Sequence, residues 1–345
     1  MMQQRMLAQG PLHRTDGILS ETGYALVPIK DYDRRRIKAP RHRIKEWDYY
    51  LIANDRFALA ITVADNGYMG LDSLSLIDFD TLAQRTVSRM SWLPLGKRGL
   101  PASSEAGVTR TVGKNYEFTF RVDAGQRQLY GHMYDFGGEK EPLLFDIVLQ
   151  EPHQNSMVIV TPFAKKPYQF YYNRKINCLP ADGRVIYQDR EYIFSPAGSF
   201  GTLDWGRGVW PYAGAWYWGS ASGIVQGRAF GLNIGYGFGD TSRATENMLF
   251  YGGIASKLGH VRFDAPRENG RDSYLLPWQV EDDAGRLSLT FTPVLDRAAE
   301  INALVLGSVQ HQVFGRFSGH ALLDDGTRLE VRDLMGFLEK VRNRW

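Results

Sequence analysis

Residues 49–79 read YYLIANDRFALAITVADNGYMGLDSLSLIDF and contain three strand-like runs joined by two turn signals. The runs cover residues 49–54, 56–64 and 68–79, and they are separated by Asn54-Asp55 and by Asp65-Asn66-Gly67. Asparagine followed by glycine between two such runs is typical of a hairpin turn, because both turn residues must accept a positive φ angle. The stretch therefore predicts consecutive antiparallel β-hairpins.

The same pattern continues along most of the chain. Aromatic residues make up 13% of the sequence, and they favour the half-buried surface of a sheet. Further strand-like runs lie at 116–122, 128–134, 143–150 and 157–163, and turn signals recur at Asp182-Gly183, Asn269-Gly270, Ala284-Gly285 and Asp325-Gly326. These features predict an all-β fold of antiparallel strands in meander order.

Helical spacing is clearest near the C-terminus. Between residues 333 and 341, the apolar residues Leu334, Phe337, Leu338 and Val341 follow the spacing of one helix face. The basic residues that follow suit the end of a helix. We expect a short C-terminal helix that packs against a barrel.

Two segments about half a chain apart are weakly similar. Trp47-Asp48-Tyr49-Tyr50 opens a strand, a turn and a second strand, and so does Trp216-Tyr217-Trp218-Gly219, whose turn is Gln226-Gly227. A repeated hairpin that opens two barrels would explain this similarity. The chain of 345 residues is long enough for two domains, and Ser195-Pro196-Ala197-Gly198 interrupts the strand pattern. We predict an N-terminal arm at 1–40, a first barrel at 41–190, and a second barrel with the C-terminal helix at 191–345.

Charge and composition argue against several classes of protein. The net charge of +3 gives no push toward nucleic acid, and we interpret the basic stretch at 33–45 as a solvated arm. The single Cys178 cannot form an intramolecular disulfide. The N-terminus lacks the apolar segment of a signal peptide, and no run of about 18 apolar residues predicts a membrane helix. We expect a cytoplasmic protein, and the sequence leaves its oligomeric state open.

Residues 201–219, GTLDWGRGVWPYAGAWYWG, contain four of the eight tryptophans. Trp216 and Trp218 alternate along a strand, so both side chains point to one face. Such aromatic residues either wall a cavity for an apolar ligand or fill a barrel core, and both interpretations remain open. The candidate ligand-binding residues in this segment are Trp205, Arg207, Trp210, Tyr212, Trp216 and Trp218.

Asp204 is the acidic residue of this segment. Beside the cation of Arg207 it would stay ionised and structural, whereas among tryptophans alone its pKa would be raised and it could act as an acid. The sequence leaves this choice open.

A second cluster, GLNIGYGFGDTSRATEN at 231–247, carries Gly235, Gly237 and Gly239 at alternate positions. The βαβ context of a dinucleotide loop is missing, so we expect a bare strand face against which an aromatic ring or a ligand could lie. Four residues of this cluster are candidates for lining the same cavity, with a surface loop as the alternative: Asn233, Tyr236, Glu246 and Asn247.

Motifs for metal or cofactor chemistry are missing from the sequence. The seven histidines include no close pair and no HExxH motif, so we expect no zinc site. The segment Gly219–Gly223 has alanine at its centre and is no nucleophile elbow, and there is no Walker A loop. We therefore expect neither a metal nor an organic cofactor.

The segments DWGRGVWPY (204–212) and 231–247 closely resemble the bacterial domain-of-unknown-function family 2804, and this resemblance covers most of the chain. The wider pattern of Tyr171-Tyr172, a turn centred on Gly183, Gly201, Asp204-Trp205-Gly206 and Trp216-Tyr217-Trp218 is similar to the AttH and hydroxyneurosporene synthase (carotenoid hydratase) group. Tocopherol cyclases and fungal Diels–Alderases look like more distant relatives. The resemblance implies two lipocalin-like barrels of the calycin type, and it implies that Asp204 donates a proton to an alkene.

The sequence also departs from the hydratase pattern. Asp204 directly precedes Trp205, where the hydratases have spacer residues, and no histidine stands in the motif. Three functions remain open. The first is binding of a hydrophobic lipid-like or terpenoid molecule in a barrel cavity. The second is cofactor-independent, acid-catalysed hydration or cyclisation of an isoprenoid-like substrate, with Asp204 and Glu246 as candidate catalytic residues. The third is a scaffold role without a ligand.

Overall fold

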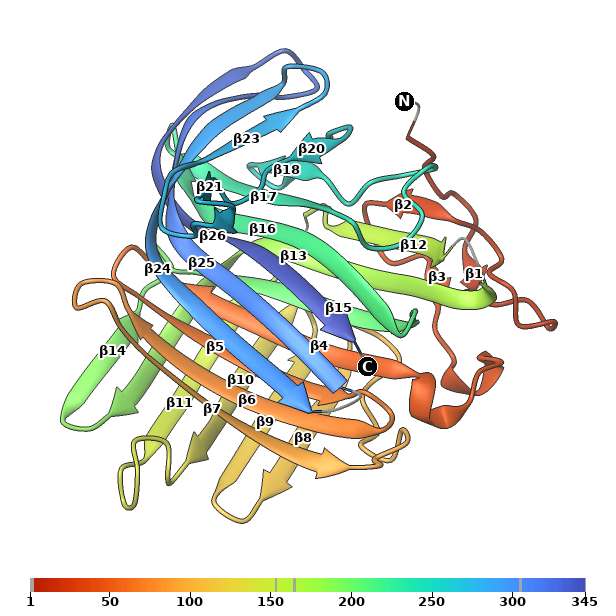
Figure 1. The fold of residues 1–345 in the computed structure, drawn as a ribbon, viewed down its shortest axis with the longest axis horizontal. Coiled ribbons are helices and arrows are strands. Elements are labelled where there is room, and N and C mark those ends of the chain that lie inside the picture. Colours follow the sequence, from red (N-terminus) through yellow and green to blue (C-terminus); the bar gives the residue numbers. More distant parts are fainter. Residues whose placement is uncertain (1–2, 153, 164–165, 304–305, 345) are drawn as a thin grey trace.

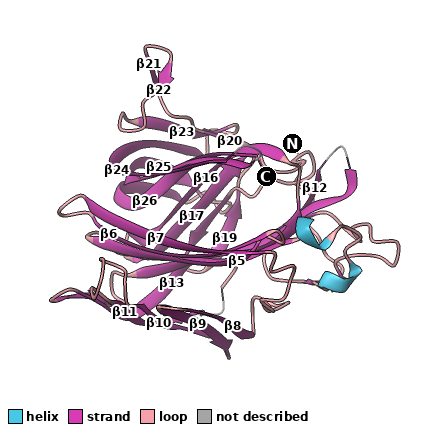
Figure 2. Ribbon diagram, turned by 60° about the horizontal axis from the view of Figure 1, so that its bottom comes forward, coloured by secondary structure: helices cyan, strands magenta, loops and turns pink. Residues whose placement is uncertain are grey.

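The computed structural model describes residues 3–152, 154–163, 166–303 and 306–344. Its strands form two large curled sheets (Figure 1). Figure 2 shows that the first sheet folds back on itself, so that β5–β7 lie between β8–β11 and the strands of the second sheet. The prediction of an all-β fold with two lipocalin-like halves in tandem is confirmed.

The first sheet has thirteen strands. Its main path runs through β7 (Ala83–Trp92), β6 (Met69–Asp78), β5 (Phe57–Asp65), β4 (Lys45–Ala53), β15 (Phe200–Val209), β13 (Lys166–Tyr187), β11 (Leu143–Gln150), β10 (Gln126–Met133), β9 (Tyr116–Asp123) and β8 (Gly107–Gly113). Beside this path lie β12 (Met157–Phe163), β2 (Gly23–Ala25) and β14 (Arg190–Phe194).

The second sheet has nine strands. Its order is β19 (Ile254–Lys257), β18 (Met248–Tyr251), β17 (Arg228–Tyr236), β16 (Ala213–Val225), β26 (Arg328–Arg344), β25 (Leu306–Leu322), β24 (Leu287–Ala303), β23 (Trp278–Asp282) and β20 (Val261–Arg262). Two small ribbons pair β1 (Gly10–Pro11) with β3 (Lys30–Asp31) and β21 (Arg267–Glu268) with β22 (Arg271–Asp272), and two 3-10 turns, η1 and η2, cover Arg34–Arg36 and Arg41–Arg43.

The repeated hairpin occupies equivalent places in the two sheets. β4 pairs with β5 on one side and with β15 on the other, and β16 pairs with β17 and β26 in the same way. The chain changes from the first sheet to the second between Val209 and Ala213, because β14 and β15 still pair with β13. The predicted division into domains at 190–191 therefore does not coincide with the change of sheet.

The predicted C-terminal helix at 333–341 is wrong, because this segment lies within β26. β26 is a central strand whose two faces are both buried: Leu334 and Leu338 pack in the second core, whereas Met335 and Phe337 pack between the sheets. The pairing with β25 also shifts register between Phe317 and Gly319, close to the partner segment around Asp333. Burial on both faces together with this irregularity produces the three- and four-residue spacing that resembles a helix.

The other predicted turns mostly match the connections of the sheets. Asn66-Gly67, Gln226-Gly227, Asn269-Gly270, Ala284-Gly285 and Asp325-Gly326 each join two paired strands. Asp182-Gly183 is the exception, since both residues lie inside the long strand β13 and pair with β11. No helix in the described part of the chain has the length and apolar character needed to span a bilayer. The cytoplasmic location stays a prediction.

Each curled sheet encloses its own core, and further apolar clusters fill the junction between the sheets. Strand β4 shows how one element serves two of these cores. Tyr50 and Ile52 face the first core, whereas Tyr49 and Leu51 face the junction. Strands β16 and β26 serve the second core and the junction in the same manner, so the junction is walled by central strands of both sheets.

Candidate functional site

In each sheet, the strand that flanks the repeated hairpin carries one carboxyl group into the buried junction. On the first sheet, Asp204 of β15 lies opposite Tyr49 of β4. On the second sheet, Glu339 of β26 lies opposite Trp218 of β16. A tryptophan two residues before each partner completes the correspondence, Trp47 on β4 and Trp216 on β16. The two acids are therefore repeat-related in position.

Asp204 is buried with polar neighbours on three sides. The Asn173 side chain donates a hydrogen bond of 2.5 Å from Nδ2 to Oδ1 of Asp204. Burial raises the pKa of Asp204 above its ordinary value, although the Lys175 cation and hydrogen bonds from Asn173 and Trp47 oppose this rise. Trp47 lies across β15 at Gly206, which has no side chain. A Cβ at this position would lie only 1.9 Å from the indole ring of Trp47. Asp204 is thus a buried carboxyl group whose pKa lies above its ordinary value because of desolvation.

Glu339 is buried still more completely, with 5% of its surface exposed. Burial raises the pKa of Glu339 to about 7, and the negative charge of Asp204 adds to the rise. The Arg297 cation and hydrogen bonds from Gln310 and Trp216 act in the opposite direction. The Gln310 bond runs from Nε2 to Oε2 over 2.8 Å. Near neutral pH, Glu339 therefore exists in both protonation states, as a general acid requires.

Glu246, the other predicted catalytic residue, forms an ion pair with Lys175 over 2.5 Å. The Lys175 ammonium group also lies 4.6 Å from the centre of the Trp218 ring. Trp218 donates from Nε1 to Asn233 over 2.8 Å, and Asn233 donates to the backbone carbonyl of Glu246 over 2.8 Å. This arrangement gives Glu246 a structural partner. Within the described ranges, no Lys or Arg side chain hydrogen-bonds to the carboxyl group of Glu339.

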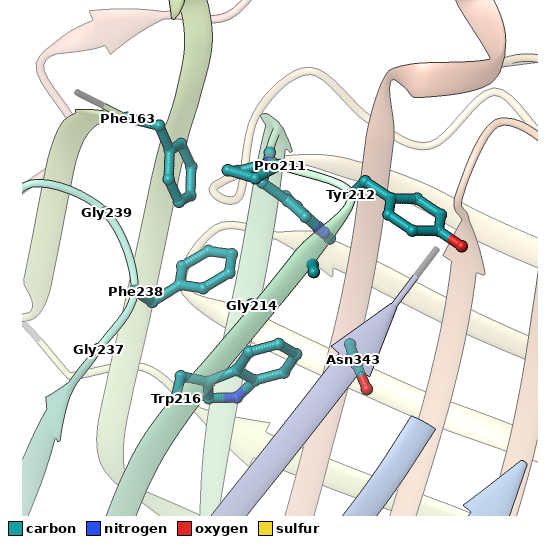
Figure 3. Close-up of a pocket in the computed structure, with 11 residues that line it drawn as sticks. Phe163, Pro211, Tyr212, Gly214, Trp216, Gly237, Phe238, Gly239 and Asn343 are labelled. Atoms are coloured by element: carbon teal, nitrogen blue, oxygen red, sulfur yellow. The ribbon is translucent and has the colours of Figure 1, made fainter. Parts of the chain in front are cut away.

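Lys175, Glu246, Trp218 and Asn233 form a polar cluster. An aromatic pocket of about 210 Å³ opens beside it. Figure 3 shows Phe163, Phe238 and Trp216 along one side, with Tyr212 and Asn343 across from them. The full lining consists of Phe163, Trp210, Pro211, Tyr212, Ala213, Gly214, Trp216, Gly237, Phe238, Gly239 and Asn343. These residues come from β12, the β15–β16 connection, β16, the segment after β17 and β26, so the pocket lies at the junction of the sheets.

Each acid is separated from the pocket by tryptophan side chains. Trp216 is part of the pocket wall, and its indole hydrogen-bonds to Glu339. Trp210 is also part of the wall, and its ring centre lies 5.3 Å from that of Trp47, whose indole hydrogen-bonds to Asp204. The arrangement combines an apolar cavity with two buried, protonatable carboxyl groups.

The structure brings some of the predicted ligand-binding residues together at the pocket. Trp210, Tyr212 and Trp216 line it, and Trp218 and Asn233 belong to the polar cluster beside it. Trp218 itself is buried in the junction cluster, where its ring meets Phe337 edge-on at 4.8 Å.

Trp205 and Arg207 lie on the opposite face of β15 from Asp204. Residues three apart on a strand point to opposite faces, so Arg207 cannot pair with Asp204. Arg207 instead contacts Asp48 over 3.1 Å, and its guanidinium lies 4.1 Å from the Trp205 ring. Arg207 therefore forms its ion pair with Asp48 in the first core, and not with Asp204.

Tyr236 and Asn247 are also placed away from the pocket. Tyr236 stacks on Tyr217 at 4.4 Å in the second half of the molecule, and it borders an open groove of about 640 Å³ beside β20 and β23. Asn247 accepts a hydrogen bond from the Gly235 amide and donates one to the Gly259 carbonyl. It therefore links the end of β17 to the segment after β19.

Sequence reasoning missed four residues of the site: Trp47, Lys175, Phe238 and Glu339. Glu339 was hidden by the helical interpretation of 333–341, because a strand would have placed Phe337, Glu339 and Val341 on one face. Trp47 carried a usable signal in its similarity to Trp216. In the described ranges, no group of three or more His, Cys, Asp or Glu side chains is arranged to hold a metal ion.

Comparisons with known proteins agree with this fold. A family model described as a domain of unknown function, DUF2804, matches residues 3–345. The crystal structure of an AttH-like protein from Nitrosomonas europaea is similar with a TM-score of 0.55 and 15% identity, covering 91% of this chain and 98% of that chain. Kievitone hydratase from Nectria haematococca is similar with a TM-score of 0.54 and 11% identity, covering 98% of each chain. No curated protein matches in sequence. At these identities the structural likeness concerns the fold alone.

Proposed function

Because this chain belongs to the DUF2804 family, whose description assigns no activity, we propose a function from the site itself: the protein binds a hydrophobic, lipid-like or terpenoid molecule in the aromatic pocket at the sheet junction. The observation that carries this proposal is a cavity walled by Phe163, Trp210, Trp216 and Phe238 beside buried carboxyl groups. Apolar walls with a few convergent polar groups are typical of small-molecule sites.

The shape of the pocket limits what it can hold. Its volume of about 210 Å³ is below the roughly 300–1,000 Å³ of pockets that enclose a whole drug-sized ligand. It accommodates one ring or one branched apolar unit, and the rest of a longer molecule extends past the exposed Tyr212. The Asn343 side chain offers a polar contact at this open side.

The two buried acids favour a second candidate function, acid-catalysed hydration or cyclisation. A protonated Asp204 or Glu339 transfers its proton to one carbon of a C=C bond, whose π electrons form the new C–H bond. The neighbouring carbon becomes a cation, which the faces of Trp210 and Trp216 stabilise. Water then forms a C–O bond with this carbon and returns a proton to the carboxylate. In cyclisation, a second C=C bond of the substrate attacks the cation instead, and a proton is lost to the carboxylate.

A fluorescence titration tests the binding proposal. N-phenyl-1-naphthylamine, a neutral hydrophobe whose emission rises in apolar sites, should bind the wild-type protein and be displaced by farnesol or by oleate. Trp216→Ala should weaken binding, because it removes a wall of the pocket. Trp92→Ala is the matched control, since Trp92 is 75% exposed on β7. Equal binding by both variants, or no binding of any of these molecules to the wild type, would favour the scaffold function.

Deuterium incorporation tests the acid chemistry. Farnesol incubated with the protein in ²H₂O should gain carbon-bound deuterium, and Asp204→Asn or Glu339→Gln should reduce this gain. Glu330→Gln, an exposed position on the same strand as Glu339, serves as the control. Binding without deuterium transfer would leave the protein as a binding protein for such molecules.

A further inference from the structure

Phe238 has an unusual position for a side chain that borders a pocket. Its ring is surrounded by four other aromatic rings, all in edge-on orientation and with ring centres 4.7–5.4 Å away. Figure 3 shows the ring between Phe163 and Trp216. The four neighbours are Phe163, Tyr171, Trp210 and Trp216. Phe238 thus fills an aromatic box whose walls other segments supply.

The walls of the box and the ring inside it differ in how they are held. Tyr171 lies on β13 and Trp216 on β16, both long paired strands. Phe238 follows the end of β17 in a segment outside the strands. Glycines flank it on both sides, with φ angles of +88° at Gly237 and +80° at Gly239. The ring can therefore move without disturbing either sheet.

Fixed points on both sides confine such a movement to three residues. Before the segment, Tyr236 stacks on Tyr217 and hydrogen-bonds through its hydroxyl group to the Phe263 carbonyl. After it, the Asp240 amide donates to the Pro162 carbonyl over 2.8 Å, and the Asp240 carbonyl accepts from Thr161 over 2.6 Å. Gly237, Phe238 and Gly239 lie between these fixed points.

The box lies directly against the polar cluster. The Tyr171 hydroxyl group is 3.5 Å from the Lys175 ammonium nitrogen, and the Tyr171 ring stacks on Trp47 with a centre distance of 6.0 Å. Trp47 and Trp216 in turn hydrogen-bond to Asp204 and Glu339. With Phe238 inside the box, both acids are at least nine-tenths buried. The Phe238 ring therefore occupies the space beside Tyr171 and Trp216, the two side chains that connect the box to the polar cluster.

We propose that Phe238 occupies the subsite for the reacting group of the substrate, and that the substrate displaces it by rotation at Gly237 and Gly239. This inference rests on the proposed function of the pocket and deepens it. The group that replaces the ring is flat, apolar and unsaturated, either an aromatic ring or the alkene of an isoprenoid unit. Four aromatic walls suit such a group, because aromatic rings pack favourably in edge-to-face pairs.

Removal of the ring tests whether it competes with ligands. Phe238→Ala should bind indole at least about tenfold more tightly than the wild type, because an occluded subsite lowers apparent affinity by the fraction of open molecules. Isothermal titration calorimetry measures the difference. Trp92→Ala, 75% exposed on β7 and outside the pocket lining, is the matched control and should leave indole affinity within about twofold of the wild type. Phe238→Leu provides a second variant with partial opening if the alanine variant does not fold.

A label on the ring tests whether it moves. With 4-fluorophenylalanine at position 238, saturating N-phenyl-1-naphthylamine should shift the ¹⁹F resonance toward that of a solvent-exposed ring. A probe that binds without moving this resonance would overturn the inference while leaving the proposed binding function intact. If the wild type binds no probe, the proposed binding function is contradicted. If Phe238→Ala nevertheless binds indole, the subsite beneath the ring is supported. No gain of indole affinity in either Phe238 variant would also overturn the inference.

Discussion

The substitution Glu339→Gln should remove a pH dependence of folding stability that originates in the buried junction. Burial raises the pKa of Glu339 from 4.5 to about 7. The folded protein therefore keeps a proton that the unfolded chain has already released between these pH values. The stability contributed by the protonated group is complete below about pH 4.5 and is lost as pH rises through 7. At 1.36 kcal/mol per pH unit, the difference between 7 and 4.5 corresponds to about 3.4 kcal/mol.

The assay is urea unfolding followed by tryptophan fluorescence at pH values from 5 to 8. Glutamine has nearly the shape of the neutral acid but cannot ionise, so the variant should gain stability relative to the wild type as pH rises. We expect this relative gain to reach about 2.5 kcal/mol between pH 5 and 8, because part of the effect is already lost at pH 5. Glu330→Gln on the same strand is exposed and should run parallel to the wild type. A difference between Glu339→Gln and wild type that stays constant within about 0.5 kcal/mol would refute the reasoning.

Two further substitutions test the fold around the site. Arg207→Met leaves Asp48 as a buried charge without its ion-pair partner, so urea unfolding should show a loss of about 3–5 kcal/mol in stability. A loss below about 0.5 kcal/mol would show that the ion pair contributes little. Gly239→Ala should cost about 1–3 kcal/mol, because φ is +80° and a Cβ would lie 2.4 Å from the Thr161 methyl group. Gly198→Ala is the control and should change stability by less than about 0.5 kcal/mol, because a Cβ there meets no atom within 4 Å. Equal effects of the two alanines would contradict the conclusion that Gly239 is required by its φ angle and its close packing.

The strands around residues 49–79 could be predicted from sequence because the information is local. Asn66-Gly67 fixes a hairpin turn, and the runs on either side correspond closely to β5 and β6. The C-terminal strand could not be recognised in the same way. Alternation marks a strand only when one face is exposed, and β26 is buried on both faces around Phe337 and Leu338. Between residues 334 and 341 its sequence therefore carries no period of two.

The candidate site could be predicted only in part for a related reason. Asp204 and Trp216 stood out because they lie in one tryptophan-rich segment. Their actual neighbours come from other strands: Lys175 from β13 and Glu339 from β26. Which residues meet across a junction depends on the register of strands far apart in the chain, and no local spacing encodes that register. The pair of Asp204 and Arg207, which the sequence left open, is not formed because strand geometry sends the two side chains to opposite faces.

A crystal structure of the protein with bound N-phenyl-1-naphthylamine would show whether a ligand replaces Phe238 in the aromatic box. We expect the aromatic rings of the probe between Tyr171, Trp210 and Trp216 at the sheet junction, with the Phe238 ring turned out of the box. Electron density for the probe in the open groove beside Tyr236 and Phe263, with the junction unchanged, would contradict this expectation.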